Sequence, residues 1–356
     1  MKSNARPLTA PRRCGRLLLI LCLGLTLLPA AFPSATDAQG SRTTVSQAVS
    51  HELLPELTLK LLPSPQSLQD FTALTISKLS AAAPFTAWKN ARTDYYPLGP
   101  GTHSWLVNVL NGEQRIGYLI ISATEEGGYL LSEYGAGTDG LPYSMNDLRQ
   151  FLVQEGLITS TFSGKAELTA LYAPMLPVWK LTLDKQTYYI NALALEMLPW
   201  SLSKAESVLN GVMPAADLVN SQEVSWSPQR AYRSGGQDDP YANLQWLTSP
   251  KLKLVNSDNV AVLLGSGGAL AYQSAGKNDI TGAPFMITGY QNWQLSAEGS
   301  AKNSISKAVI YAASGLQGRR YIPLSTLQQT GTLHKLPQAG NIASGTNTPT
   351  AGSMLK

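Results

Sequence analysis

The spacing of apolar residues predicts a helical start for the part of the chain that follows its first 40 or so residues. From Ser46 to Leu62 apolar residues recur every four positions, which predicts a helix kinked or divided at Pro55. The pattern predicts a second helix over Leu68–Leu79 and a short third one from Pro84 to Trp88, since proline suits the first turn of a helix. We therefore expect the N-terminal region to be helical.

After residue 100 the pattern changes to that of β-strands. Runs rich in β-branched and aromatic residues cover Ser104–Leu110 and Arg115–Ser122, on either side of Asn111-Gly112, which suits a tight hairpin turn. A third run, Tyr129–Tyr134, completes a predicted antiparallel meander. Next comes a predicted helix over Ser144–Gln154, with the serine as its N-cap.

The remaining predicted elements are mostly strands. Three strands are expected before residue 200, at Ala166–Tyr172, Val178–Leu183 and Thr187–Asn191. Past residue 250, short apolar runs between glycine-containing turns predict a mostly β unit; they are Val260–Leu264, Leu270–Gln273, Pro284–Thr288, Ala308–Ala313 and Arg320–Leu324. Because helices and strands are segregated, the sequence predicts an α+β fold: N-terminal helices plus an antiparallel meander, followed by a mostly β C-terminal unit.

Composition suggests where the domains begin and end. We expect a leader at 1–38, an α+β domain at 39–200, a linker or long loop at 201–250 and a β-rich domain at 251–336. Residues 337–356 are small and polar with few large apolar groups, so they are predicted to form a disordered tail.

The leader has the features of a secretory signal peptide. Lys2 and four arginines precede an unbroken apolar run, Leu17–Leu28, and small residues follow it. This run is shorter than the roughly 20 residues that span a bilayer, so no transmembrane anchor is expected. Cleavage is expected after Ala31, Ala35 or Ala38, leaving a protein that is secreted, either free or associated with the cell wall.

The leader also accounts for the cysteines and the excess of positive charge. Cys14 and Cys22 both lie in it, so the mature chain is expected to have no disulfide, thiolate ligand or cysteine nucleophile. Five of the 27 Lys and Arg and one of the 23 Asp and Glu also lie there, which leaves 22 of each sign. That balance argues against nucleic-acid binding, because neutralising phosphates needs an excess of cations.

Two residues are candidates for catalysis, His103 and Glu133. His103 begins a predicted strand and is either a general base or an ordinary strand-end residue; Glu133, flanked by aromatic residues, is either its partner or faces solvent. His51 is expected to be a surface residue of the first helix, and no function is expected for His334, which precedes the tail. The glycine-rich stretch Leu264–Gly268 is interpreted as a hairpin turn rather than a phosphate loop, and no cofactor or metal site is expected.

Several stretches resemble known groups of proteins. Tyr96–Trp105, Gly117–Ile121 and Leu131–Gly135 resemble secreted proteins of unknown function from Gram-positive spore-forming bacteria. Together with Trp179–Leu181 and Tyr188–Ala192, they are similar to propeptide-like modules that precede some secreted bacterial peptidases. This similarity covers about residues 90–200. It implies a small α+β unit that occupies an enzyme cleft or assists folding.

A further stretch, Ala283–Tyr290, resembles the strand that carries the catalytic histidine in papain-like and bacteriocin-processing-type cysteine peptidases. Here Ala283 or Pro284 stands in the place of that histidine, and the nucleophilic cysteine has no counterpart. The resemblance therefore implies a catalytically inactive relative.

Taken together, the residues favour a secreted, non-catalytic protein that binds a protein or a cell-wall polymer. Two alternatives stay open. One is a secreted hydrolase that uses His103 and carboxylates such as Glu133, and the other is an inhibitor or chaperone-like propeptide relative of secreted peptidases.

Overall fold

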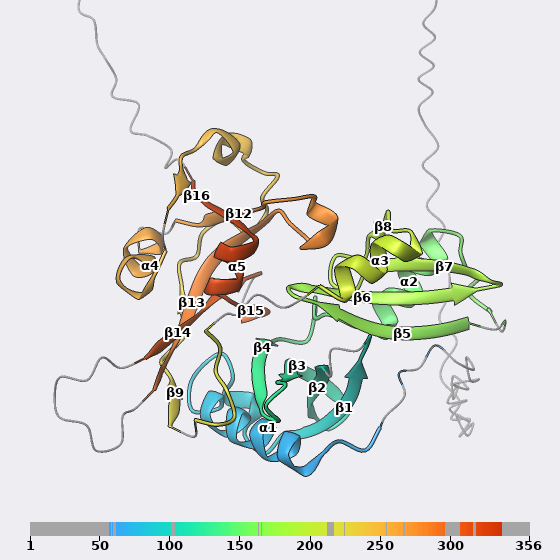
Figure 1. Ribbon diagram of the computed structural model, residues 1–356, viewed down its shortest axis with the longest axis horizontal. Helices are drawn as coiled ribbons and strands as arrows, with labels where there is room; N and C mark the ends of the chain where they lie inside the picture. The colour runs from blue at the N-terminus through green and yellow to red at the C-terminus, as the bar shows by residue number, and fades with distance from the viewer. Residues whose placement is uncertain are drawn as a thin grey trace, which may run out of the picture. The chain divides into compact units, whose positions relative to one another are not determined.

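Helices and antiparallel strands make up the described part of the chain (Figure 1), in agreement with the predicted α+β class. The computed structural model describes residues 57, 59, 62–100, 104–162, 164, 166–211, 217–223, 225–253, 255–265, 268–295, 307–315 and 318–336. These belong to a unit that spans His51–Lys356, separate from a unit at Met1–Ser50. The predicted signal peptide and tail, both cysteines, His51, His103 and most of the first predicted helix lie outside the described residues.

The helices fall at both ends of the chain and between its strands. They are α1 (Gln66–Leu79), α2 (Met145–Gln154), α3 (Leu202–Leu209), α4 (Ser257–Leu264) and α5 (Leu324–Thr330), with short 3₁₀ helices η1 (Thr86–Trp88), η2 (Leu244–Thr248) and η3 (Asn278–Ile280). The predicted helices ending at Leu79 and Gln154 are confirmed as α1 and α2. The Ser144 side chain accepts a hydrogen bond from the Asp147 N–H at 3.3 Å, which is the predicted cap.

Most strands belong to one large antiparallel sheet. Its N-terminal strands are β1 (Arg92–Leu98), β2 (Ser104–Asn111), β3 (Gln114–Ala123) and β4 (Tyr129–Ala136). Its later strands are β9 (Trp226–Pro228), β10 (Tyr232–Arg233), β11 (Lys251–Leu252), β12 (Leu270–Ser274), β13 (Phe285–Leu295), β14 (Ala308–Ser314), β15 (Arg320–Pro323) and β16 (Gly331–Lys335). The main order is β1-β2-β3-β4-β15-β14-β13-β12-β16-β11, with β9 and β10 also pairing with β13.

A second sheet in the described part contains β5 (Ala166–Ala173), β6 (Leu176–Leu183), β7 (Gln186–Asn191) and β8 (Met197–Leu198), in that order. One face, with Trp179 and Leu181, packs together with α2 and the meander. The other face, with Val178 and Tyr189, is covered by α3, which lies over β6 and β7 in Figure 1. Residues 201–250, expected to be a linker or loop, include α3, η2 and the short strands β9 and β10.

The meander β1–β4 therefore has a different core on each face. Alternate residues such as Val107 and Leu119 pack against α1, and Leu106 and Ile120 pack against the second sheet. Strands β2, β3 and β4, which were predicted from their runs of β-branched and aromatic residues, are all confirmed. Strand β1 was not predicted, because Pro97 and its charged residues interrupt the pattern.

Two expectations for the C-terminal unit are wrong. Val260–Leu264 is the end of α4 rather than a strand, since Asn256 and Asn259 form a capping box that starts a helix ahead of the apolar run. A short apolar run fits a buried helix as well as a strand, and the cap decides between them. The connection at Leu264–Gly268 is consequently not a hairpin turn, because it joins α4 to β12.

The two halves of the large sheet meet at a narrow junction between β4 and β15. Tyr134 is paired with Tyr321, and their rings stack with centroids 5.0 Å apart. A Cβ on Gly135 would lie only 1.8 Å from the Arg319 carbonyl oxygen. Glycine is therefore required here by the close approach of two backbones.

We predict that Gly135→Ala lowers the free energy of unfolding by about 1 to 3 kcal/mol, the usual cost of overpacking, because a backbone carbonyl cannot rotate aside as a side chain can. Urea denaturation measures the change. Gly128→Ala is the matched control, since its added methyl would meet only side-chain atoms, the nearest at 3.3 Å. Equal stability of the two variants would contradict the proposed constraint at the junction.

Candidate functional site

Glu133, one of the two predicted catalytic candidates, lies in β4 beside a β-bulge. Glu133 pairs with Ile120 and Leu131 with Ile121, so Ser132 is an extra residue between them. Side chains alternate between the faces of a strand, and the extra residue shifts this alternation. Glu133 consequently points toward Tyr118 on the face of the second sheet, whereas Tyr134 belongs to the core beneath α1.

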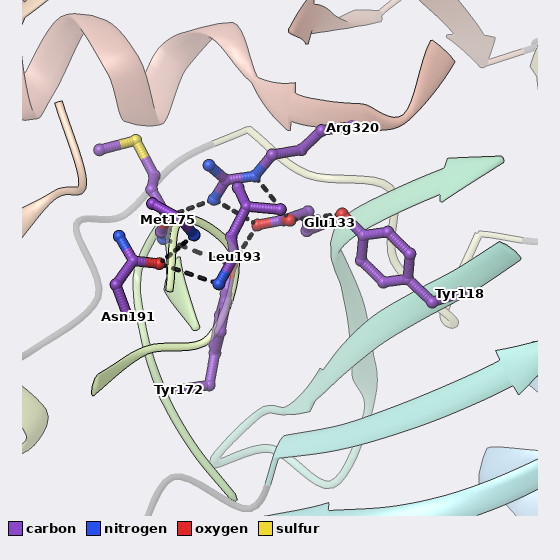
Figure 2. A network of polar contacts seen from close by, with 8 residues as sticks. Tyr118, Glu133, Tyr172, Met175, Asn191, Leu193 and Arg320 are labelled. Atoms are coloured by element: carbon purple, nitrogen blue, oxygen red, sulfur yellow. Dashed lines mark hydrogen bonds and ion pairs between the residues drawn. The ribbon is translucent and has the colours of Figure 1, made fainter. Parts of the chain in front are cut away.

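The carboxylate of Glu133 forms a bidentate ion pair with Arg320 of β15 (Figure 2). Arg320 Nε donates to Oε1 at 2.8 Å and Nη2 donates to Oε2 at 3.0 Å. Tyr118 Oη donates to Oε1 at 2.6 Å and Tyr172 Oη donates to Oε2 at 3.2 Å, so each carboxylate oxygen accepts two hydrogen bonds. Arg320 also donates to the carbonyl of Met175, in the turn between β5 and β6.

This buried centre favours the charged ion pair and neutral tyrosines. Burial, and then the negative charge of Glu133, raise the pKa of Tyr118 and of Tyr172 well above the usual tyrosine value. Burial alone lowers the pKa of Arg320, but the charge and hydrogen bonds of Glu133 outweigh it and raise that pKa above the usual value. The arginine therefore stays a cation held by its carboxylate.

The expectation that Glu133 faces solvent is wrong, because none of its surface is exposed. Its hypothesised partner, His103, lies outside the described residues. Both carboxylate oxygens are occupied by Arg320 and two tyrosines, so Glu133 is enclosed and links β4 to β15.

His334, for which no function is expected from the sequence, is buried in β16 and lies in a different set of contacts. Its Nδ1 is 3.1 Å from the Ser249 carbonyl oxygen, and its Nε2 is 3.1 Å from Gln273 Oε1. The ring also meets Trp246 edge to face, with centroids 5.7 Å apart. These contacts hold η2 and β12 to β16.

The described ranges contain neither a metal-binding cluster nor a helix that could span a membrane. No group of three or more His, Cys, Asp or Glu side chains there is arranged to hold a metal ion. Among the same residues, no helix has the length and apolar character needed to span a bilayer.

An open groove of about 630 Å³ lies between α1 and the first half of β1. Its helix wall includes Ala73 and Ser77, which are exposed and one turn apart, and its strand wall includes Thr93 and Tyr95. Small side chains on the helix keep the groove wide. We call this the α1–β1 groove; it is lined by Thr72, Ala73, Ile76, Ser77, Ser80, Ala81, Trp88, Lys89, Asn90, Ala91, Thr93 and Tyr95.

The groove wall is mostly uncharged and rich in hydroxyl groups. Lys89 is the only ionisable residue of the lining apart from Tyr95. Thr72, whose side chain is buried at the wall, has a hydroxyl with no hydrogen-bond partner within the described part of the chain. Trp88 is fixed by a 3.2 Å hydrogen bond from its Nε1 to the Ile116 carbonyl, and its ring packs where Gly117 leaves room.

None of the groove residues was singled out from the sequence. Much of the lining comes from α1, which was predicted, and from β1, which was not. No sequence pattern therefore predicted a groove between these two elements. One hint is present in Thr93 and Tyr95, two residues with high strand propensity at alternate positions just before Pro97.

No protein-family model matches the sequence, and neither a curated protein nor a solved structure is significantly similar to the chain. Evidence about its role therefore comes from the geometry of its own residues.

We predict that Glu133→Gln lowers the free energy of unfolding by about 3 to 5 kcal/mol, because the neutral amide leaves the buried Arg320 cation without a counterion. Chemical denaturation measures the loss. Glu167→Gln is the control, since Glu167 is exposed on β5, where surface charges contribute about 1 kcal/mol or less. A loss in Glu133→Gln no larger than in the control would show that the ion pair is unimportant for stability.

We also predict a steep loss of stability in alkali. Burial raises the pKa of Tyr118, Tyr143 and Tyr172 well above the usual value. The stability that these neutral tyrosines contribute is fully present below about pH 10, the usual pKa of tyrosine in an unfolded chain. Above that pH, each of them lowers the free energy of unfolding by about 1.4 kcal/mol per pH unit. The measured free energy of unfolding should therefore fall by the sum of their shares as pH rises.

Tyr118→Phe removes one of these groups and should reduce the alkaline slope by one tyrosine's share, whatever it does to stability at neutral pH. An unchanged slope would contradict the raised pKa of Tyr118.

Proposed function

We propose that this chain is an exported, non-catalytic binding protein that holds a segment of another protein in the α1–β1 groove. The single observation that carries the proposal is an open groove of about 630 Å³ bordered by a strand at the edge of a sheet. Export is proposed from the leader at 1–38, whose sequence is typical of a secretory signal peptide.

Size and rigidity support a binding role for the groove. Its volume is within the roughly 300 to 1,000 Å³ that is usual for ligand sites. Its helix wall is anchored by Leu68, Phe71 and Leu79, which are buried in the core beneath α1. Walls fixed in this way need little reordering when a ligand binds, which limits the entropy that binding costs.

The chemistry of the walls favours a protein segment over a wall polymer. Sugar rings in binding sites stack on open aromatic faces, but Trp88 is only 1% exposed. The Tyr95 hydroxyl accepts a hydrogen bond from Thr93 Oγ1 at 3.3 Å, within the strand wall. What the groove does offer is hydroxyl groups, a hollow for side chains and the adjoining edge of β1, which suit a polypeptide.

The non-catalytic part of the proposal is supported by Glu133. Of the two catalytic candidates it is the one that the structure describes, and its carboxylate is enclosed in the ion pair with Arg320. That centre joins parts of the fold and is not part of the groove lining.

We predict that Ser77→Trp weakens peptide binding at least tenfold, because an exposed indole in the middle of the helix wall fills the groove. The probe is a phage-displayed library of linear peptides of about ten residues, a length that includes most strands. Peptides enriched on the wild-type chain are then synthesised, and their dissociation constants are measured by fluorescence anisotropy.

Ser67→Trp is the matched control, since it places the same side chain on the same helix outside the groove lining and should leave binding unchanged. Failure of the wild-type chain to enrich any peptide, or equal binding by Ser77→Trp, would overturn the proposal. Binding of purified wall polysaccharide that Ser77→Trp abolishes would replace it with the wall-polymer hypothesis.

A further inference from the structure

The outer edge of β1 pairs with no strand among the described residues beside Thr93 and Tyr95. It specifies how a segment would be held, and this step rests on the proposed function. We infer that the ligand is an extended peptide that adds to the sheet alongside β1, forming backbone hydrogen bonds with Thr93 and Tyr95 while alternate side chains enter the α1–β1 groove. This mode of recognition, in which a peptide becomes an additional strand, draws affinity from main-chain hydrogen bonds and specificity from side-chain pockets.

Strand β1 has one partner in the described part of the chain. It pairs with β2 from Arg92 to Leu98 in a register without shifts, and it is the terminal strand in the order of the large sheet. In an antiparallel pair, successive residues direct their backbone groups alternately toward the neighbour and away from it. Half of the β1 residues therefore point their N–H and C=O groups outward.

Pro97 identifies which half points outward. Proline lacks an N–H, and within an edge strand it occupies a position whose nitrogen faces away from the neighbouring strand. Since β1 has no bulge against β2, Tyr95 and Thr93 have the same orientation as Pro97. The N–H and C=O groups of Thr93 and Tyr95 are thus the ones available to an added strand.

The side chains of the same two residues face the groove. Tyr95 packs with the core beneath α1, whereas Tyr96 and Leu98 pack with the core of the second sheet. Thr93 and Tyr95 both belong to the groove lining. A peptide strand beside them would direct every second side chain toward α1, into the hollow between Ser77 and the strand.

The surroundings also limit the length and chemistry of the peptide. Pro97 offers no donor, and just beyond it Gly99 is bridged to Leu171 of β5, so pairing ends there. A wall of small and hydroxyl side chains suits an uncharged side chain of small or medium size. The inferred ligand is a short, extended, uncharged peptide segment.

The first test compares two substitutions of Thr93 in the full chain, using the peptides selected on the wild type. Thr93→Pro removes the outward N–H in a conformation that a strand already has, whereas Thr93→Val keeps the N–H and removes the hydroxyl. We expect Thr93→Pro to weaken binding about five- to tenfold, as the loss of one backbone hydrogen bond predicts. Thr93→Val should bind within about twofold of the wild type, by the same energetics.

The second test leaves the protein unchanged, so it does not depend on the folding of a variant. Each backbone nitrogen of a selected peptide is methylated in turn. Added as a strand, the peptide should lose affinity at alternate positions and tolerate methylation between them, because only every second N–H faces β1.

The outcomes separate this inference from the proposed function. Peptides that bind in the groove but show no alternation under methylation, with Thr93→Pro equal to Thr93→Val, would overturn strand addition and leave a groove that binds side chains. Loss of all peptide binding in the wild type would overturn both.

Discussion

The buried ion pair between Glu133 and Arg320 is the contact on which the arrangement of the described fold depends. It connects β4 of the meander with β15 of the C-terminal strands, and the bond from Arg320 to the Met175 carbonyl adds the second sheet. Desolvating two charges costs several kcal/mol per ion, and only close, saturated geometry offsets it. The two tyrosines and the bidentate contact supply that geometry.

Such a centre explains why the strand junction can be short. Tyr134 and Tyr321 are the pair by which β4 and β15 are joined, and a ladder of one pair has little stability of its own. The ion pair and the stacked rings add side-chain contacts to this junction, and they enclose the Glu133 carboxylate. The binding role that we propose therefore rests on another surface, the α1–β1 groove.

Helices and strands with a regular local pattern of apolar residues can be predicted from the sequence. The face on which a side chain lies cannot be predicted where one extra residue changes the alternation along a strand. Helix α1 follows from regular spacing because it buries one face against a core, and strands β2 and β3 follow from runs of β-forming residues because they bury both faces. Glu133 could not be placed, since the extra Ser132 reverses the alternation and its partner Arg320 lies 187 residues further along the chain.

Strand β1 illustrates the same limit in another way. Its backbone groups on one side satisfy β2, but its alternation is broken by Pro97 and by the Arg92–Asp94 ion pair, so no period marks it as a strand. The groove consequently could not be predicted from the sequence, although the sequence contains every residue that lines it. A site formed by an element without a periodic signal needs tertiary structure to be seen.

The residues that prevent β1 from being predicted as a strand also limit its pairing as an edge strand. Exposed edge strands promote aggregation, and proteins restrain them with prolines and charges. Arg92, Asp94 and Pro97 are of these kinds, and they restrict outward donors to the short stretch at Thr93 and Tyr95. In the binding mode that we infer, an edge with two outward donors beside the groove would pair with a short peptide and not with a long strand. The features that limit pairing along β1 would then also make the inferred pairing selective.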